Sequence, residues 1–202
     1  MSDNPNQKTI CVYASSSDAL DPVYCEAAEH LGALIARRGH RLIYGAGQVG
    51  LMGVVARAVH AHGGHVIGVI PERLRALELA YEGADELIVT ETMRERKAIM
   101  ESRADAFIAL PGGFGTIEEL VEVVVLRQLH YHDKPIVLLN TNGVYDALLS
   151  FFHRLHDDHF IKESHFGLFH IAKGLRDAIE HIEGYVPKPR EDKWFPIRAE
   201  EG

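Results

Sequence analysis

The chain has 202 residues, of which 47% are hydrophobic and 25% charged, and its formal net charge is -8. These values fit one globular domain with a full-sized core, and the negative charge argues against a general attraction to nucleic acids or acidic membrane surfaces. The first residues lack the basic-then-apolar layout of a signal peptide, and no apolar run approaches the ~18 residues of a membrane span. We therefore expect a cytoplasmic protein that uses neither nucleic acid nor membrane as a partner. Its two cysteines, Cys11 and Cys25, fit reduced thiols better than a disulfide framework.

The apolar pattern alternates between strand-like and helix-like segments along the whole chain. We expect a single domain over residues 9–184, preceded by a flexible segment at 1–8 and followed by a loose, proline- and charge-rich arm at 185–202. Such alternation is typical of an α/β protein with one parallel sheet covered by helices on both faces. The expected strands are residues 9–13, 41–44, 65–70, 86–90, 106–110, 134–139 and 167–171, and the expected helices are 22–38, 51–60, 93–100, 116–129, 144–155 and 175–182.

Two polar or glycine-rich turns follow the first two strands. The serine turn at 14–18 is typical of a loop that leads into a helix, but its place after a strand makes Ser16 a candidate ligand contact. The second turn, GAGQVG at 45–50, formally matches G-x-G-x-x-G, although in a dinucleotide-binding fold that fingerprint follows the first strand. We interpret Gly45 and Gly47 as phosphate or ribose contacts. The alternative is that these glycines only allow close packing.

Three histidines, His60, His62 and His65, end the helix after that turn. A zinc site would need converging ligands with a supporting second shell. A helix C-terminus, where positive charge is favourable, explains these residues more simply, so we expect no metal.

A run of charged residues lies between the third and fifth strands. Glu78 lies beyond the C-terminal end of a predicted strand, where ligands of such sheets bind, although it could equally be an exposed helical acid. Arg94, Arg96 and Lys97 could form a solvated helix face paired with nearby glutamates. Because this helix leads directly into the next strand, Arg96 could instead face the turn after that strand and contact a phosphate or a leaving base.

The most informative stretch is PGGFGTIEE at residues 111–119, which follows a buried apolar strand. Its glycines let main-chain N–H groups approach a ligand at a helix N-terminus, which makes the turn a natural anion site. We expect Thr116 to cap the helix, with Glu119 completing a capping box. Carboxylates beside a phosphate would repel it, so Glu119 could alternatively hold sugar hydroxyls or stabilise a developing cation. The helix itself is apolar on nearly every side, which predicts a second covered face and hence a homodimer.

The stretch at 111–119 resembles the PGGxGTxxE signature of the LONELY GUY family, the cytokinin-activating phosphoribohydrolases once widely mislabelled lysine decarboxylases. Residues 44–53, 63–71, 93–100 and 134–140 are also similar to that family, and the resemblance covers roughly residues 9–161. It implies a Rossmann-like fold, a dimer, and hydrolysis of the N-glycosidic bond of N6-modified adenosine 5'-monophosphates to free base and ribose 5-phosphate. Many members also accept AMP, and no metal or organic cofactor is implied.

The resemblance also implies individual site residues. The catalytic pair would be Arg96 and Glu119. This chain departs from the family where a Thr-Trp pair is replaced by Val125-Leu126 and where a glycine is replaced by Ala14. The implied nucleotide-binding residues are Glu78, Arg96, Lys97, Gly112, Gly113, Phe114, Gly115, Thr116, Ile117 and Glu118.

Three other functions were weighed against hydrolysis. A non-catalytic nucleotide carrier or sensor would keep the glycine loops but would not need Arg96 and Glu119 as a pair. A pyridoxal-phosphate decarboxylase would need a Schiff-base lysine, for which Lys97 is the central candidate. A nicotinamide-dependent oxidoreductase based on residues 45–50 is disfavoured because no separate substrate domain fits.

Overall fold

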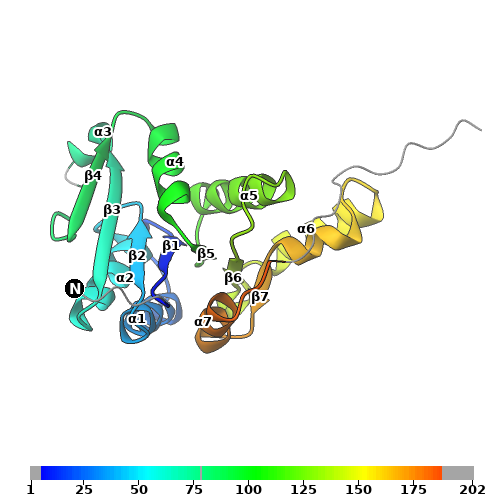
Figure 1. Cartoon of the computed structure of the whole chain (residues 1–202), viewed down its shortest axis with the longest axis horizontal. Helices are drawn as coiled ribbons and strands as arrows, with labels where there is room; N and C mark the ends of the chain where they lie inside the picture. Colours follow the sequence, from blue (N-terminus) through cyan, green and yellow to red (C-terminus); the bar gives the residue numbers. More distant parts are fainter. Residues whose placement is uncertain (1–5, 78, 188–202) are drawn as a thin grey trace, which may run out of the picture.

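The computed structural model describes residues 6–77 and 79–187, and its centre is a seven-stranded sheet in which all strand pairs are parallel (Figure 1). The order β4-β3-β2-β1-β5-β6-β7 confirms the predicted α/β class. The strands are β1 (Thr9–Tyr13), β2 (Arg41–Tyr44), β3 (His65–Pro71), β4 (Glu86–Thr90), β5 (Ala106–Ala109), β6 (Ile136–Leu139) and β7 (His170–Ala172).

Helices cover both faces of the sheet, as predicted. Apolar residues of α1, α2 and α7 share one core cluster with the sheet, and those of α4, α5 and α6 share another, so the two sets lie on opposite faces (Figure 1). The short α3 (Glu72–Arg75) follows β3 directly. The other helices are α1 (Pro22–Arg37), α2 (Gly50–Ala61), α4 (Met93–Arg103), α5 (Phe114–Gln128), α6 (Asp146–Asp157) and α7 (Leu175–Glu183), with 3-10 turns η1 (Thr141–Gly143) and η2 (Glu163–Leu168).

The strand order reverses between β1 and β5. The chain first builds outward from β1 to β4 and then crosses back to place β5 on the other side of β1. Ligands of open parallel sheets bind at such a reversal, beyond the carboxyl ends of the strands. Two contacts join the turns there: the Ser15 amide donates to the Pro111 carbonyl (3.3 Å), and the Gly50 amide donates to the Asp18 carboxylate (2.7 Å). The serine turn, the glycine turn after β2 and the turn after β5 therefore form one edge.

Many element boundaries differ from the prediction by one to three residues, and α3 is absent from the predicted helices. Strand β6 begins at Ile136 rather than at 134, and η2 occupies part of the segment predicted as the last strand. Helix α5 begins at Phe114, two residues before the predicted Thr116. Its N-cap is Gly113, so the turn enters the helix directly from the glycines and Thr116 lies inside the first turn.

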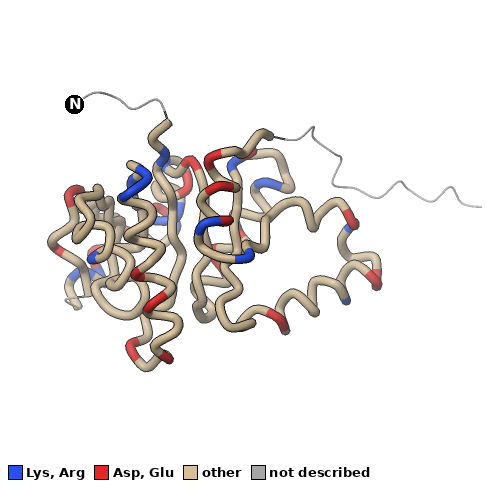
Figure 2. The backbone as a smooth tube through the Cα atoms, turned by 90° about the horizontal axis from the view of Figure 1, so that it is seen from below, with Lys and Arg blue, Asp and Glu red and all other residues tan. Residues whose placement is uncertain are grey.

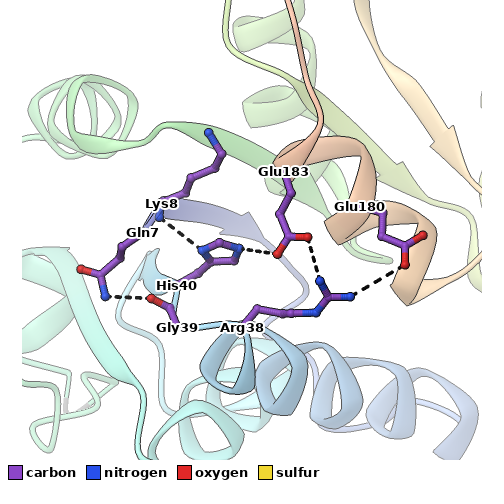
Figure 3. A network of polar contacts seen from close by, with 7 residues as sticks. All are labelled: Gln7, Lys8, Arg38, Gly39, His40, Glu180 and Glu183. Atoms are coloured by element: carbon purple, nitrogen blue, oxygen red, sulfur yellow. Dashed lines mark hydrogen bonds and ion pairs between the residues drawn. The ribbon is translucent and has the colours of Figure 1, made fainter. Parts of the chain in front are cut away.

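A polar network ties the start of the chain to its last helix (Figure 3). The buried His40 ring accepts a hydrogen bond from the Lys8 amide (3.2 Å) and donates to Glu183 on α7 (3.1 Å). Arg38 also reaches Glu183 (2.8 Å), and the Gln7 amide group donates to the Gly39 carbonyl (2.7 Å). The network fixes α7 against the turn between α1 and β2.

Along the backbone, positions of Lys and Arg are interspersed with positions of Asp and Glu (Figure 2). Across residues 6–77 and 79–187, no helix is both long and apolar enough to cross a membrane. Cys11 is buried and Cys25 is partly buried, and both are free thiols, as predicted.

Candidate active site

A cleft of about 450 Å³ opens at the reversal of strand order. Residues from all three turns of that edge line it, together with side chains from α3, α4 and the segment after α3. The lining residues are Ala14, Ser15, Ser16, Ser17, Gly45, Gly47, Val49, Met52, Ile70, Leu74, Leu79, Arg96, Gly113, Phe114, Gly115, Thr116 and Glu119.

Arg96 is the cation of this cleft, and its residue is only 7% exposed. Its Nε donates to the carbonyl of Val69 on β3 (3.1 Å), which fixes the guanidinium across the ends of the strands. A Cβ at Gly45 would lie 1.6 Å from the Nη2 atom of Arg96. Gly45 is therefore required because the arginine side chain occupies the space where any other side chain would begin. The helix bearing Arg96 is not merely a solvated charged face.

Glu119 lies beside Arg96, with 3.6 Å between its Oε1 atom and Nη1 of the arginine. Its side chain is only 12% exposed. Burial raises the pKa of Glu119 to about 7, and the neighbouring Glu118 and Glu122 add to this, while Arg96 and Lys97 lower the pKa. Loss of hydration therefore outweighs the attraction of the arginine. A carboxyl group with a pKa near neutrality in a cleft is typical of a catalytic acid or base.

The glycine loop leads into α5 without a side-chain cap, so the predicted capping box is wrong. The first intrahelical hydrogen bond runs from the Ile117 amide to the Gly113 carbonyl (3.0 Å), which leaves the preceding amides of the first turn without an intrahelical acceptor. Thr116 instead packs under the loop, since a Cβ at Gly112 would lie 2.0 Å from its hydroxyl oxygen. Because Glu119 takes no part in a cap, its carboxylate is available to the cleft.

Gly113 and Gly115 face open space, and a Cβ built on either would meet no heavy atom within 4 Å among the described residues. Packing therefore does not explain these two glycines. Their bare backbone leaves room for close approach by a ligand. Phe114 between them is 95% exposed.

The glycines of the turn after β2 allow close packing, and two of them also line the cleft. Gly50 adopts a positive φ of 59°, and a Cβ there would lie 2.5 Å from the Ser16 backbone. Gly47 lies against Met52, where an added Cβ would come within 2.5 Å of the methionine methyl group. Close packing is thus confirmed for Gly50 and Gly47, and because Gly45 and Gly47 also line the cleft, their contact with a phosphate or ribose stays a prediction.

Several of the predicted binding residues lie outside the cleft lining. Lys97 forms ion pairs with Glu118 and with Glu122 (2.9 Å) along the neighbouring helices. Burial opposes the charged form of Lys97, but its hydrogen bonds to Glu118 and Glu122 outweigh this and raise its pKa. Gly112 and Ile117 are not among the lining residues, and Glu78 lies outside the described residues. Of the two departures from the family pattern, Ala14 lines the cleft and Val125 does not.

Sequence analysis missed the apolar wall of the cleft. Met52, Ile70, Leu74 and Leu79 form it, and they come from α2, β3, α3 and the segment after α3. No local motif marks these residues. The sequence feature that could have indicated this wall is the mixed apolar and charged segment after Pro71, which follows the end of a predicted strand.

Two of the three histidines share a partner, because His60 (2.9 Å) and His65 (3.6 Å) both contact the Asp85 carboxylate. His60 contacts Tyr81 and Asp85, and His62 contacts Arg37 and the Ala58 carbonyl. Within the described part of the chain, no group of three or more His, Cys, Asp or Glu side chains could hold a metal ion.

The fold and cleft define a Rossmann-like protein with a glycine loop beside a buried arginine–glutamate pair, and the comparisons agree with this fold. A family model described as "Possible lysine decarboxylase" matches residues 52–182. The chain is 44% identical over 180 residues to the cytokinin riboside 5'-monophosphate phosphoribohydrolase LOG5 of Arabidopsis thaliana, covering 89% of this chain and 79% of the relative. It is 45% identical over 181 residues to the phosphoribohydrolase LOG of Oryza sativa subsp. japonica, covering 90% and 75%.

The chain therefore belongs to the LONELY GUY family of cytokinin riboside 5'-monophosphate phosphoribohydrolases. Among solved structures, the molybdenum cofactor carrier protein of Chlamydomonas reinhardtii is similar in fold, with a TM-score of 0.68 and 25% identity over 88% of this chain and 96% of that one. The molybdenum cofactor binding protein of Rippkaea orientalis gives a TM-score of 0.67 at 24% identity, with the same coverage of both chains.

The buried Glu119 predicts an unusual dependence of stability on pH. Its pKa is raised in the folded state from 4.5 to about 7, so between these values the folded protein binds more protons than the unfolded chain. Stability should therefore fall as pH rises through this window. Glu119→Gln should remove a cost on the order of 3 kcal/mol at pH 8 and little at pH 4, measured by urea unfolding at both values.

Glu122→Gln is the matched control, because it makes the same change in charge on the same helix at a side chain that is 41% exposed and paired with Lys97. An equal gain for both variants at pH 8, or none for Glu119→Gln, would contradict the assignment of the raised pKa to Glu119.

Proposed function

We propose that this protein hydrolyses the N-glycosidic bond of adenosine 5'-monophosphates, with or without an N6 substituent, and releases free base and ribose 5-phosphate. The names of its relatives support the reaction, since LOG5 and LOG are cytokinin riboside 5'-monophosphate phosphoribohydrolases. The observation that carries the proposal is the Arg96–Glu119 pair, buried in a cleft beside the open face of the glycine loop.

The phosphate is assigned to the loop between β5 and α5. The first-turn amides of α5 point into an anion site at the positive end of the helix, and the bare faces of Gly113 and Gly115 let the phosphate oxygens approach. The phosphate would then fix the ribose between the loop and Glu119.

The chemistry is assigned to Glu119 and Arg96. As the bond between the ribose C1' and the base nitrogen breaks, positive charge develops on the sugar, and the ionised Glu119 stabilises it or accepts a proton from the attacking water. The electron pair of the broken bond leaves with the base, the water oxygen bonds to C1', and the proton lost by the water ends on the released base nitrogen. The Arg96 guanidinium, held by the Val69 carbonyl, orients the nucleotide or stabilises the departing base. Water is the only co-reactant, so the proposal needs no metal or organic cofactor.

A non-catalytic carrier is the second candidate, because the molybdenum cofactor carrier protein has the same fold. A carrier needs the anion loop but has no use for a carboxyl group whose pKa lies near 7 beside an arginine. For the decarboxylase interpretation, Lys97 would have to form a Schiff base, yet it is engaged with Glu118 and Glu122 and lies outside the cleft lining. Glycosidic hydrolysis is therefore favoured over both.

The direct test is to incubate the protein with AMP and with isopentenyladenosine 5'-monophosphate and to quantify free base and ribose 5-phosphate. Glu119→Gln should lower kcat by about 1,000-fold or more, because the positive charge that develops on the sugar during the reaction would lose its carboxylate. AMP binding should persist, since this charge is absent from the bound substrate. Glu122→Gln should retain turnover within about threefold, since its carboxylate pairs with Lys97 on the surface.

If the folded protein binds AMP but releases free base from neither nucleotide, the carrier function would be favoured. Equal turnover by Glu119→Gln and the unchanged protein would remove Glu119 from the chemistry.

We also propose that two copies of the chain associate through α5 and α6. An almost wholly apolar groove of about 170 Å³ lies between these helices and η2, lined by residues that include Val121, Val125, Phe152 and Phe166. Val125 is 39% exposed, and Phe151 and Tyr131 add further exposed apolar area nearby in the chain. Exposed apolar patches of this kind mark association surfaces. A cytoplasmic location stays a prediction from the sequence.

Sedimentation equilibrium at micromolar concentration tests the association. The expected mass is about 45 kDa, twice the 22.5 kDa of one chain. Val125→Asp should shift the protein towards the monomer, because it would bury a carboxylate in an apolar contact. Val186→Asp places the same charge on an exposed residue beyond α7 and should leave the mass unchanged. A clean monomer for the unchanged protein would overturn the proposal.

A further inference from the structure

Residues 79–85, here called the strap, form one wall of the cleft by pairing with the glycine turn after β2. Ala80 and Gly47 form an antiparallel bridge. The Gln48 amide donates to the Leu79 carbonyl (2.9 Å), and the Tyr81 amide donates to the Ala46 carbonyl (2.8 Å). The side chain of Leu79 thereby becomes part of the cleft lining.

The strap is anchored from behind by the histidine segment for which the reaction has no use. The Tyr81 hydroxyl lies 2.9 Å from Nδ1 of His60, at the end of α2, and the two rings are in contact with centroids 5.6 Å apart. His60 Nε2 lies 2.9 Å from Asp85 at the other end of the strap. Asp85 also accepts the Val66 amide at the start of β3 (2.8 Å). One histidine therefore joins both ends of the strap to α2.

The chemistry of the groups fixes the direction of these hydrogen bonds. An ionised carboxylate only accepts, so the Nε2–H of His60 donates to Asp85. In the neutral ring Nδ1 then accepts the proton of the Tyr81 hydroxyl. Burial raises the pKa of Asp85, but the Val66 amide, His60 and His65 outweigh it and lower the pKa, which keeps the carboxylate ionised. Tyr81, His60 and Asp85 thus form one relay of hydrogen bonds from the strap to the end of α2.

The strap supplies the apolar Leu79 to the cleft, while the charged residues Arg96 and Glu119 come from α4 and α5. In the proposed function the loop amides hold the phosphate and Arg96 and Glu119 act at the glycosidic bond. The wall formed by Leu79, Leu74 and Met52 is left for the base, and an apolar wall favours an apolar substituent on it.

We infer that Tyr81, His60 and Asp85 are positioning residues, which hold Leu79 in the cleft wall and so set the affinity for the base end of the nucleotide. The inference rests on the proposed function for the identity of the ligand. Its structural part, that the relay holds the strap against the glycine turn, is independent of any turnover.

The test compares Tyr81→Phe, which removes one hydroxyl, with the unchanged protein. The expected result is a rise of about fivefold in KM for isopentenyladenosine 5'-monophosphate with kcat unchanged within about twofold, as for the loss of one hydrogen bond that does not touch the reacting atoms. Hydrogen exchange of the Gln48 and Tyr81 amides should quicken by a similar factor. His60→Gln should act in the same direction.

His62→Gln is the matched control, because this histidine lies just beyond the same helix but contacts Arg37 and the Ala58 carbonyl instead of the strap. It should change neither KM nor the exchange of those two amides. In the background of Leu79→Ala, Tyr81→Phe should add no further rise in KM, since the residue through which it acts is gone.

Unchanged KM and unchanged amide exchange in folded Tyr81→Phe and His60→Gln would overturn the inference. A full additional rise in KM on top of Leu79→Ala would also overturn it, because Tyr81 would then act by another route. If the unchanged protein released no base, the proposed function would fail, and the relay would be judged by amide exchange and by the Kd for AMP.

Discussion

The site depends on one crowded contact, the passage of the Arg96 side chain over Gly45. A Cβ at residue 45 would displace the guanidinium, whose Nε donates to the carbonyl of Val69 and whose Nη1 lies 3.6 Å from the Glu119 carboxylate. The turn after β2, helix α4 and the first turns of α5 have to meet for this to happen. The reversal of strand order between β1 and β5 brings them together, so the topology of the sheet and the chemistry of the cleft are set by the same feature.

Glu119 shows which of two opposing effects wins in this cleft. Attraction by Arg96 favours the ionised carboxylate, and loss of hydration favours the neutral acid. The pKa of about 7 means that burial prevails. The fold therefore holds a carboxylate that the solvent would stabilise better. In the proposed reaction, positive charge that develops on the sugar would stabilise this carboxylate. Lys97 forms ion pairs with Glu118 and Glu122, and these three residues are not among those that line the cleft.

Much of this arrangement could be predicted from the sequence, because its signals are local. The periodicity of the apolar residues gave the parallel sheet and most helix bounds, and the order of elements brought Arg96 to the glycine loop. The helix start could not be placed, since Thr116 and Glu119 satisfy a capping pattern that the glycines before them make unnecessary. The Leu79 wall and its anchor through Tyr81 and His60 depend on contacts between distant segments, for which no single stretch carries a signal. Lys97 and Glu118 match the family pattern, but only the structure shows that they pair with each other.

The pH dependence of kcat/KM for AMP tests the central claim most directly. If the ionised Glu119 stabilises the sugar cation or activates water, kcat/KM should fall about tenfold per pH unit below about 7, where the carboxylate becomes protonated. The same midpoint should appear when the Glu119 carboxyl is titrated by carbon-13 NMR. A rate that is flat from pH 5 to pH 8, with Glu119 titrating near 7, would show that this carboxylate does not carry the chemistry.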